Sequence, residues 1–229
     1  MKTIVLSFLL FMCGGITVFA QKDVTTFLGI PIDGYKPEMK KALIAKGFSQ
    51  SAVPGADCLE GEFKGTDVNV YIVTNNNKVY RIMLCDKNTQ NEANIKIRFN
   101  NLVSQFANNK RYTALEDYTI PEGEDMSYEM VVHKKNYDAI FYQNPSPEKI
   151  DTLEIQSRVK TALLAKYTEE QLANPTEDIT KDIQAQAIQI GMEILFKKPV
   201  WFRICENYGK YYISMFYDNE YNHANGEDL

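Results

Sequence analysis

Six runs rich in β-branched and aromatic residues restrict the fold of this chain more than any other feature. They come as three pairs, each joined by a short turn: Val68–Thr74 with Lys78–Cys85, Ser127–His133 with Tyr137–Tyr142, and Val200–Glu206 with Lys210–Tyr217. Such residues favour strands, and the Asn and Gly residues of the turns tolerate the left-handed backbone that hairpins need. With a further run at 58–63, the pattern predicts an antiparallel sheet built from a meander and two hairpins.

The segments between these runs show helical periodicity. A helix is predicted from Thr89 to about Asn108, because Thr89 and Glu92 have the spacing of a capping box and an apolar stripe follows them. The stripe consists of Ile95, Phe99, Leu102, Val103 and Phe106. Further helices are predicted at Lys36–Lys46, at 147–166 and from Asn174 to about Lys197. The expected fold class is therefore α+β, with amphipathic helices packed on one face of the antiparallel sheet.

The first twenty residues have the pattern of an export signal. Lys2 precedes an apolar run, and Val18-Phe19-Ala20 provides a cleavage site before Gln21. We expect residues 1–20 to be a signal peptide, the mature protein to be periplasmic or secreted, and no stable membrane span to remain after cleavage. Lipid anchoring at Cys13 is the alternative, but the bulky Met12 stands where lipoprotein processing needs a small residue.

Residues 21–229 are expected to form a single exported domain. The alternative is a division into two halves, 21–111 and 126–229, joined by the polar stretch Tyr112–Asp125. Without Lys2, 24 Lys and Arg residues face 30 Asp and Glu residues, a net charge of −6. A mildly acidic chain without basic blocks is not attracted to phosphate backbones, which argues against nucleic acid as a partner.

The sequence carries no complete catalytic or metal-binding motif. Three cysteines remain after residue 20, namely Cys58, Cys85 and Cys205, and they include no CxxC pair. The two histidines, His133 and His223, lie in polar segments where a solvated ring is the simpler interpretation. We therefore predict no catalytic residue, no metal ligand and no cofactor, and the sequence leans against an enzyme without deciding the matter.

Aromatic residues are concentrated in the last predicted hairpin and in the segment after it. Tyr and Trp combine a large apolar surface with a polar group, as binding surfaces require. The candidate binding surface consists of Trp201, Tyr211, Tyr217 and Tyr221. Its expected partner is a protein or a glycan, and the hypothesis requires that Trp201, Tyr211 and Tyr217 include exposed residues.

The run Phe27-Leu28-Gly29-Ile30-Pro31-Ile32-Asp33-Gly34, followed later by Lys46-Gly47-Phe48, resembles the start of uncharacterised exported proteins of Bacteroidetes-type bacteria. Gly61-Glu62-Phe63, Val68-Asn69-Val70-Tyr71 and Met215-Phe216-Tyr217-Asp218-Asn219 continue the resemblance. A short helix before an antiparallel meander is also similar in outline to the β-lactamase-inhibitor-protein-like and outer-membrane-assembly lipoprotein folds. The resemblance implies a fold and an exported location, and it carries no catalytic residue.

Three functions remain open from the sequence. The first is a non-catalytic binding or interaction module of the cell envelope or exterior. The second is an envelope scaffold that associates through an exposed sheet edge. The third is a hydrolase of envelope or dietary polymers, which would need two carboxyl groups in a cleft, at least one with a raised pKa.

Overall fold

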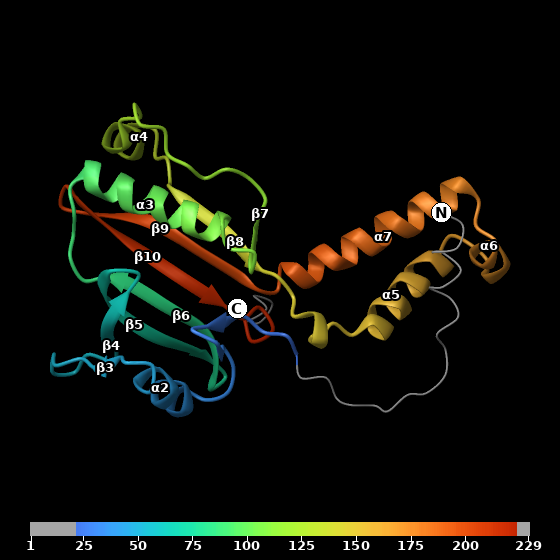
Figure 1. Ribbon diagram of the computed structural model, residues 1–229, viewed down its shortest axis with the longest axis horizontal. Coiled ribbons are helices and arrows are strands. Elements are labelled where there is room, and N and C mark those ends of the chain that lie inside the picture. Colours follow the sequence, from blue (N-terminus) through green and yellow to red (C-terminus); the bar gives the residue numbers. More distant parts are fainter. Residues whose placement is uncertain (1–21, 224–229) are drawn as a thin grey trace.

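The computed structural model describes residues 22–223, so the predicted signal segment with Cys13 lies outside the described residues (Figure 1). Its largest element is an eight-stranded antiparallel sheet with the strand order β3-β4-β5-β6-β10-β9-β8-β7. The strands are β3 Ser49–Gln50, β4 Leu59–Phe63, β5 Thr66–Asn75, β6 Lys78–Asp86, β7 Tyr112–Ala114, β8 Asp138–Gln143, β9 Pro199–Asn207 and β10 Lys210–Asp218. The predicted meander is β4-β5-β6, and the predicted last hairpin is β9-β10. The α+β class is thus confirmed.

The centre of the sheet joins strands from the two ends of the chain. β10 pairs with β6, for example Met215 with Leu84, so segments before and after the polar stretch 112–125 belong to one sheet. The stretch itself is held against helix α3 (Glu92–Ala107). Asn100 exchanges two hydrogen bonds of 2.9 Å with the backbone of Ile120, and Lys96 donates to two backbone carbonyls further along.

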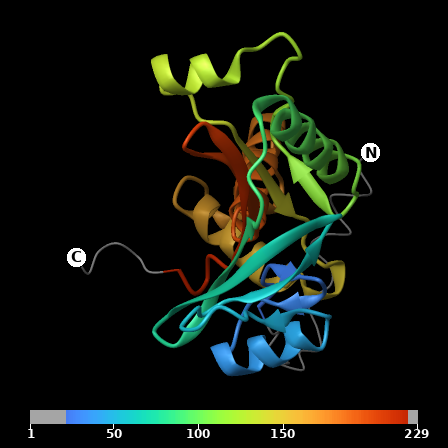
Figure 2. The same ribbon diagram turned by 90° about the vertical axis from the view of Figure 1, so that its left-hand side faces the viewer.

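The two faces of the sheet differ in what covers them. On one face, alternate residues of every long strand are buried in a common core, and α3 packs there with its apolar stripe (Figures 1 and 2). Helix α2 (Lys36–Ile44) packs on the same side against β5 and β6, and the short pair β1 (Thr26–Phe27) and β2 (Ile30–Pro31) precedes it. The opposite face carries an apolar row whose members are paired strand to strand: Tyr71, Met83, Phe216, Trp201 and Ile140.

The helices after β8 do not lie on the sheet, contrary to the prediction that helices cover one face. α5 (Thr152–Leu164) and α7 (Glu177–Leu195) pack on each other, with the short α6 (Glu169–Ala173) between them and the 3-10 turn η1 (Pro147–Lys149) before them. Together they project from one end of the sheet as a two-helix arm (Figure 1). At its base, Lys198 forms a buried ion pair of 2.8 Å with Asp23.

The predicted middle hairpin is wrong in its first half. Residues 126–132 form helix α4 (Met126–Val132) instead of a strand, because the side chain of Asp125 caps the first turn by accepting from the backbone N–H of Tyr128. β8 pairs instead with β9 and with the three-residue β7. The β-branched pair Val131–Val132 suggested a strand, but the cap and the neighbouring contacts decide for a helix.

Two helices begin later than predicted, each after a residue whose side chain caps the first turn. Asn91, and not Thr89, caps α3 by accepting from the backbone N–H of Asn94, so the expected capping box is absent. The helix predicted from Asn174 begins at Glu177, because Thr176 caps it. Asn174 ends α6.

Candidate ligand-binding groove

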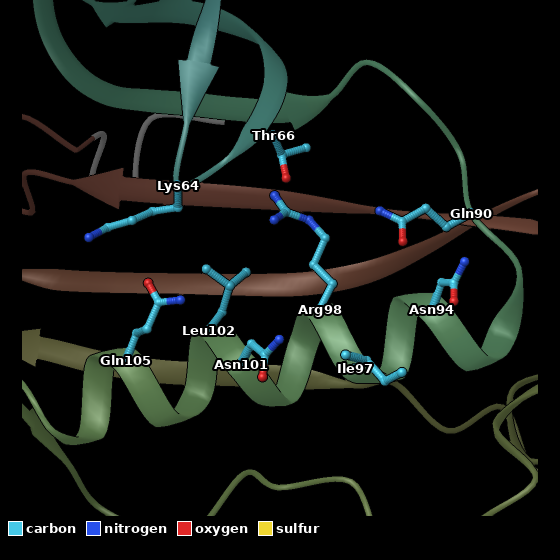
Figure 3. Close-up of a pocket in the computed structure, with 9 residues that line it drawn as sticks. All are labelled: Lys64, Thr66, Gln90, Asn94, Ile97, Arg98, Asn101, Leu102 and Gln105. Carbon is cyan, nitrogen blue, oxygen red and sulfur yellow. The ribbon is translucent and has the colours of Figure 1, made fainter.

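A groove of about 320 Å³ lies between one side of α3 and the turn that joins β4 to β5 (Figure 3). The turn is a two-residue connection, Lys64-Gly65, in which both residues have positive φ angles of 51° and 76°. Such a turn fits a hairpin of directly paired strands, here Phe63 opposite Thr66. The left-handed conformation at Lys64 places this residue beside the groove that α3 lines on the other side.

Four carboxamide side chains line the groove: Gln90, Asn94, Asn101 and Gln105. Gln90 precedes α3, and the other three share one side of the helix because their spacing follows the helical repeat. The apolar stripe of α3, which packs into the core, lies next to this side, and its member Leu102 also lines the groove. The packing of the stripe against the sheet therefore fixes which residues of α3 face the groove.

The polar groups of this lining have few partners inside the protein. The side chains of Lys64, Asn101 and Gln105 form no hydrogen bond or ion pair with any described residue, and the same holds for the carboxamides of Gln90 and Asn94. Each carboxamide offers two donor hydrogens and an acceptor oxygen. Ile97 is exposed among them, so the groove combines unpaired hydrogen-bonding groups with one apolar contact point.

Arg98 forms the base of the groove and is fixed by a buried carboxylate. Its Nε and Nη2 donate to Asp86 at 2.8 and 2.6 Å, and the side chains of Arg98 and Asp86 are only 12% and 2% exposed. Asp86 also accepts from the backbone N–H of Ile213 at 3.1 Å. Such a two-pronged ion pair holds the guanidinium in one orientation, towards Thr66 in Figure 3. The Nη1 donors take no part in this pair.

The lining of the groove consists mainly of hydrogen-bonding and cationic groups. Its lining contains amides, a hydroxyl, a free ammonium group at Lys64 and a fixed guanidinium, and it contains no carboxylate, cysteine or histidine. Nowhere between residues 22 and 223 do three or more His, Cys, Asp or Glu side chains gather as metal ligands would. The groove therefore presents hydrogen-bond donors and acceptors and two cationic groups, one of which is already paired with Asp86.

The binding surface predicted from the aromatic residues is wrong at two of its four positions. Tyr211 and Tyr217 are 5% and 3% exposed and belong to the core. Tyr217 packs on the ring of Phe27 with centroids 4.9 Å apart. The hydroxyl of Tyr211 is hydrogen-bonded to Ser127 at 2.7 Å. Neither ring is available to a partner.

Trp201 is partly exposed on the opposite face of the sheet, but its ring is engaged within the protein. It stacks on Phe216 at 3.9 Å, and the guanidinium of Arg203 lies 5.3 Å from its centroid. Its Nε1 donates to Asp218 at 2.9 Å, and Asp218 also holds Arg81 through two hydrogen bonds. Trp201 is thus the centre of an internal stack and does not offer an open aromatic platform.

Tyr221 lies elsewhere, at the base of the arm. The ammonium groups of Lys22 and Lys197 are 4.9 and 6.0 Å from its ring centroid, and partial burial raises the pKa of its hydroxyl. Of the four predicted residues, the structure therefore brings none into the groove and does not join them into one surface. The amide pattern on α3 was missed, although its spacing of 94, 101 and 105 is readable in the sequence.

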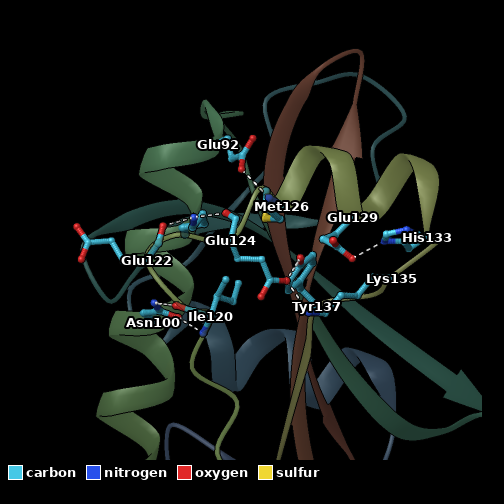
Figure 4. A network of polar contacts seen from close by, with 11 residues as sticks. Glu92, Asn100, Ile120, Glu122, Glu124, Met126, Glu129, His133, Lys135 and Tyr137 are labelled. Atoms are coloured by element: carbon cyan, nitrogen blue, oxygen red, sulfur yellow. Dashed lines mark hydrogen bonds and ion pairs between the residues drawn. The ribbon is translucent and has the colours of Figure 1, made fainter.

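Glu124, in the polar stretch 112–125, belongs to a network of polar contacts (Figure 4). Glu124 accepts from Tyr137 and pairs with Lys135 at 2.5 Å, and these hydrogen bonds lower the pKa of its carboxyl group. Burial and the same carboxylate raise the pKa of Tyr137. Glu92 accepts from the backbone N–H of Met126 at 2.7 Å and so ties α3 to α4.

Acid catalysis by a carboxyl group would require a raised pKa. Among the described residues, every carboxyl group with a shifted pKa is shifted downward, and the shifts come from hydrogen bonds donated to the ionised form. These groups are Asp57, Glu60, Asp117, Glu124 and Asp182. The hydrolase alternative thus gains no support from them.

The cysteines Cys58, Cys85 and Cys205 are free thiols. The thiols of Cys85 and Cys205 both lie beside the hydroxyl of Ser214, at 3.4 and 3.6 Å. Burial raises the pKa of Cys85, which makes its thiol a weaker nucleophile at neutral pH. The histidine His133 ends α4 and is hydrogen-bonded to Glu129 at 2.8 Å.

Comparison with family models, with curated proteins and with solved structures finds no match. The resemblance to exported Bacteroidetes-type proteins and to the β-lactamase-inhibitor-protein-like outline accordingly stays a prediction. None of the helices in the described part of the chain combines the length and the hydropathy that a membrane crossing requires.

Proposed function

We propose that this chain is an exported, non-catalytic binding module whose amide-lined groove holds an extended peptide segment that carries a carboxylate. One observation carries the proposal: five polar side chains without a partner in the described chain converge on one groove. They are Lys64, Gln90, Asn94, Asn101 and Gln105. Four of them, all except Gln90, are exposed, so their hydrogen-bonding groups are available to a ligand.

The chemistry of the lining favours peptide over glycan. A primary carboxamide can donate to the carbonyl and accept from the N–H of a peptide group, so a series of them suits an extended backbone. Lys64 and the free Nη1 of Arg98 suit a carboxylate, and Ile97 suits an apolar side chain of the ligand. Aromatic platforms, on which sugar rings stack, are missing from this lining.

A triple variant, Asn94→Ala, Asn101→Ala and Gln105→Ala, tests the groove. Alanine has the highest helix propensity, so these exposed positions of α3 should tolerate it, and a loss of binding then reports on the groove and not on the fold. The matched control is Gln184→Ala with Gln189→Ala, two exposed carboxamides on α7. Peptides selected from a random displayed library on the wild-type protein are measured against both variants by calorimetry.

We expect the selected peptides to contain Asp, Glu or a free carboxyl terminus, to bind the control normally and to lose at least tenfold in affinity for the triple variant. The side-chain NH₂ signals of Asn94, Asn101 and Gln105 should shift in NMR spectra on binding. Peptides that bind the triple variant as well as the wild type would contradict the proposal. A glycan array screened in parallel would reassign the ligand class if a glycan showed the same dependence.

The exported location is tested separately. The protein recovered from its host should begin at Gln21 when its amino terminus is sequenced. A start at Cys13 with an attached lipid would establish the anchored alternative. The alternative of a scaffold that associates through a sheet edge is less well supported. The outermost strands β3 and β7 have only two and three residues and present few backbone groups for pairing.

A further inference from the structure

The groove beside α3 is a cationic site on an acidic chain. Without residues 1–20 the chain has a net charge of −6, yet the lining of the groove contains Lys64 and Arg98 and no carboxylate. Lys64 has no partner in the described chain, and Arg98 is paired through Nε and Nη2 only. An acidic peptide segment is therefore attracted to this part of the surface.

The chain itself contains a segment of matching chemistry. Residues 224–229, which follow the described part, read Ala-Asn-Gly-Glu-Asp-Leu. Two adjacent carboxylates, Glu227 and Asp228, are followed directly by the apolar Leu229, and the segment has no cationic residue. The other segment outside the described part, 1–21, contains no Asp or Glu. Of these two segments, only 224–229 supplies the side-chain carboxylates that a cationic groove would bind.

The length of the groove matches the length of this segment. Asn94 and Gln105 line its two ends along α3, and at about 1.5 Å per residue they are about 16 Å apart. Six residues in extended form span about 17 Å. The exposed Ile97 lies towards the Asn94 end and Lys64 towards the Gln105 end (Figure 3). An apolar residue at one end of the bound segment therefore finds an apolar contact, while the carboxylates lie near the cations.

The segment does not reach the groove of its own chain. Its attachment is fixed at one end of β5, where Asn222 donates to the backbone carbonyl of Val79 at 2.9 Å and accepts from Asn75 at 3.1 Å. The groove lies at the other end of β5, beside Thr66, and the ten residues of this strand span about 30 Å. Five residues beyond 223 add at most about 18 Å. The segment must therefore come from another copy.

We propose that the groove binds residues 224–229 of a second copy of this chain, with their two carboxylates facing Lys64 and Arg98. This inference rests on the proposed function, because it names the peptide that the groove holds. The groove and the segment are different surfaces, so the association is head-to-tail, and each pair keeps one open groove and one unbound segment. A six-residue contact between charged groups predicts weak association, which added salt weakens further.

Sedimentation velocity with two complementary variants tests the proposal on the chain that begins at Gln21. One variant ends at His223, so it lacks the segment and keeps the groove. The other is the triple alanine variant of α3, which keeps the segment and has an altered groove. The wild type should associate as its concentration rises to several hundred micromolar, and each variant alone should stay monomeric and folded by circular dichroism. A mixture of the two variants should form one-to-one pairs and nothing larger.

A peptide of residues 218–229 tests which carboxylates are recognised. It carries an amide at its end, so only side-chain carboxylates act, and fluorescence anisotropy measures its binding to the variant that ends at His223. Replacing Glu227 with Gln and Asp228 with Asn should weaken binding about tenfold or more. The matched control makes the same two changes outside the segment, at Glu220 and Asp218, and should bind like the original peptide.

A wild-type chain that stays monomeric at every concentration would overturn the proposal. So would association that persists in the variant ending at His223, or a peptide that both pairs of substitutions weaken equally. Failure of the proposed function has a different signature. If the variant ending at His223 binds library-selected acidic peptides but not this one, the groove binds peptides and only the inference about the second copy is wrong. If it binds neither, the proposed function itself is wrong.

Discussion

The ion pair between Arg98 and Asp86 allows a quantitative test of how the base of the groove is built. Replacing Arg98 with Met keeps most of the side-chain volume and removes the charge that faces an almost fully buried carboxylate. Removing one partner of a buried pair costs about 3–5 kcal/mol. We expect the lower end, about 3 kcal/mol, because Asp86 keeps the hydrogen bond from the backbone N–H of Ile213.

The second variant, Arg98→Met with Asp86→Asn, separates charge from packing. The introduced carboxamide would be neutral and could still accept from Ile213, so most of the loss should be recovered and the double variant should cost only about 1 kcal/mol. Without this comparison, a loss of stability in the single variant could be assigned to any packing defect.

Urea unfolding followed by fluorescence measures both variants. Trp201 is the single tryptophan of the chain and stacks on Phe216, so its emission should report the loss of the sheet. With a denaturant dependence of about 2–3 kcal/mol per molar urea, a loss of about 3 kcal/mol lowers the midpoint by about 1 M. A single variant that moves the midpoint by less than about 0.3 M, or a double variant no more stable than the single one, would refute the reasoning.

Three further predictions follow from other sites. Gly191→Ala should raise the stability of the protein by up to about 1 kcal/mol in thermal unfolding, because a Cβ there would meet nothing within 4 Å, and a loss of stability would mean that the glycine serves the arm itself. Gly61→Ala should cost about 1–3 kcal/mol, because the new Cβ would lie 2.5 Å from the buried ring of Phe48; Phe48→Leu in the same background should restore part of it. Hydrogen bonds from Lys135 and Tyr137 lower the pKa of Glu124 in the folded state, so Glu124 stabilises the fold above its ordinary pKa of 4.5 and loses this contribution as the pH falls. The stability of Glu124→Gln should therefore decrease less between neutral and acidic pH than that of the wild type, and an unchanged pH dependence would contradict the assignment.

The parts of the fold that the sequence predicted are those decided by neighbours along the chain. The apolar stripe of α3 and the turn between β9 and β10 depend on residues a few positions apart, and both were located within a few residues. The strand predicted at Ser127–His133 failed because composition favoured a strand while a local cap at Asp125 favoured a helix. Here two local signals disagreed, and only the surrounding contacts decided between them.

The aromatic surface failed for a different reason, which is the face that each residue takes in the sheet. Apolar residues occupy both faces of β10, so the sequence pattern does not show which set points to the core. The register settles it: Trp201 pairs with Phe216, whereas Tyr217 pairs with Val200. Trp201 and Tyr217 therefore lie on opposite faces and cannot form one surface. The groove was missed because it forms only when the β4–β5 turn meets α3, two segments that are separated in the sequence.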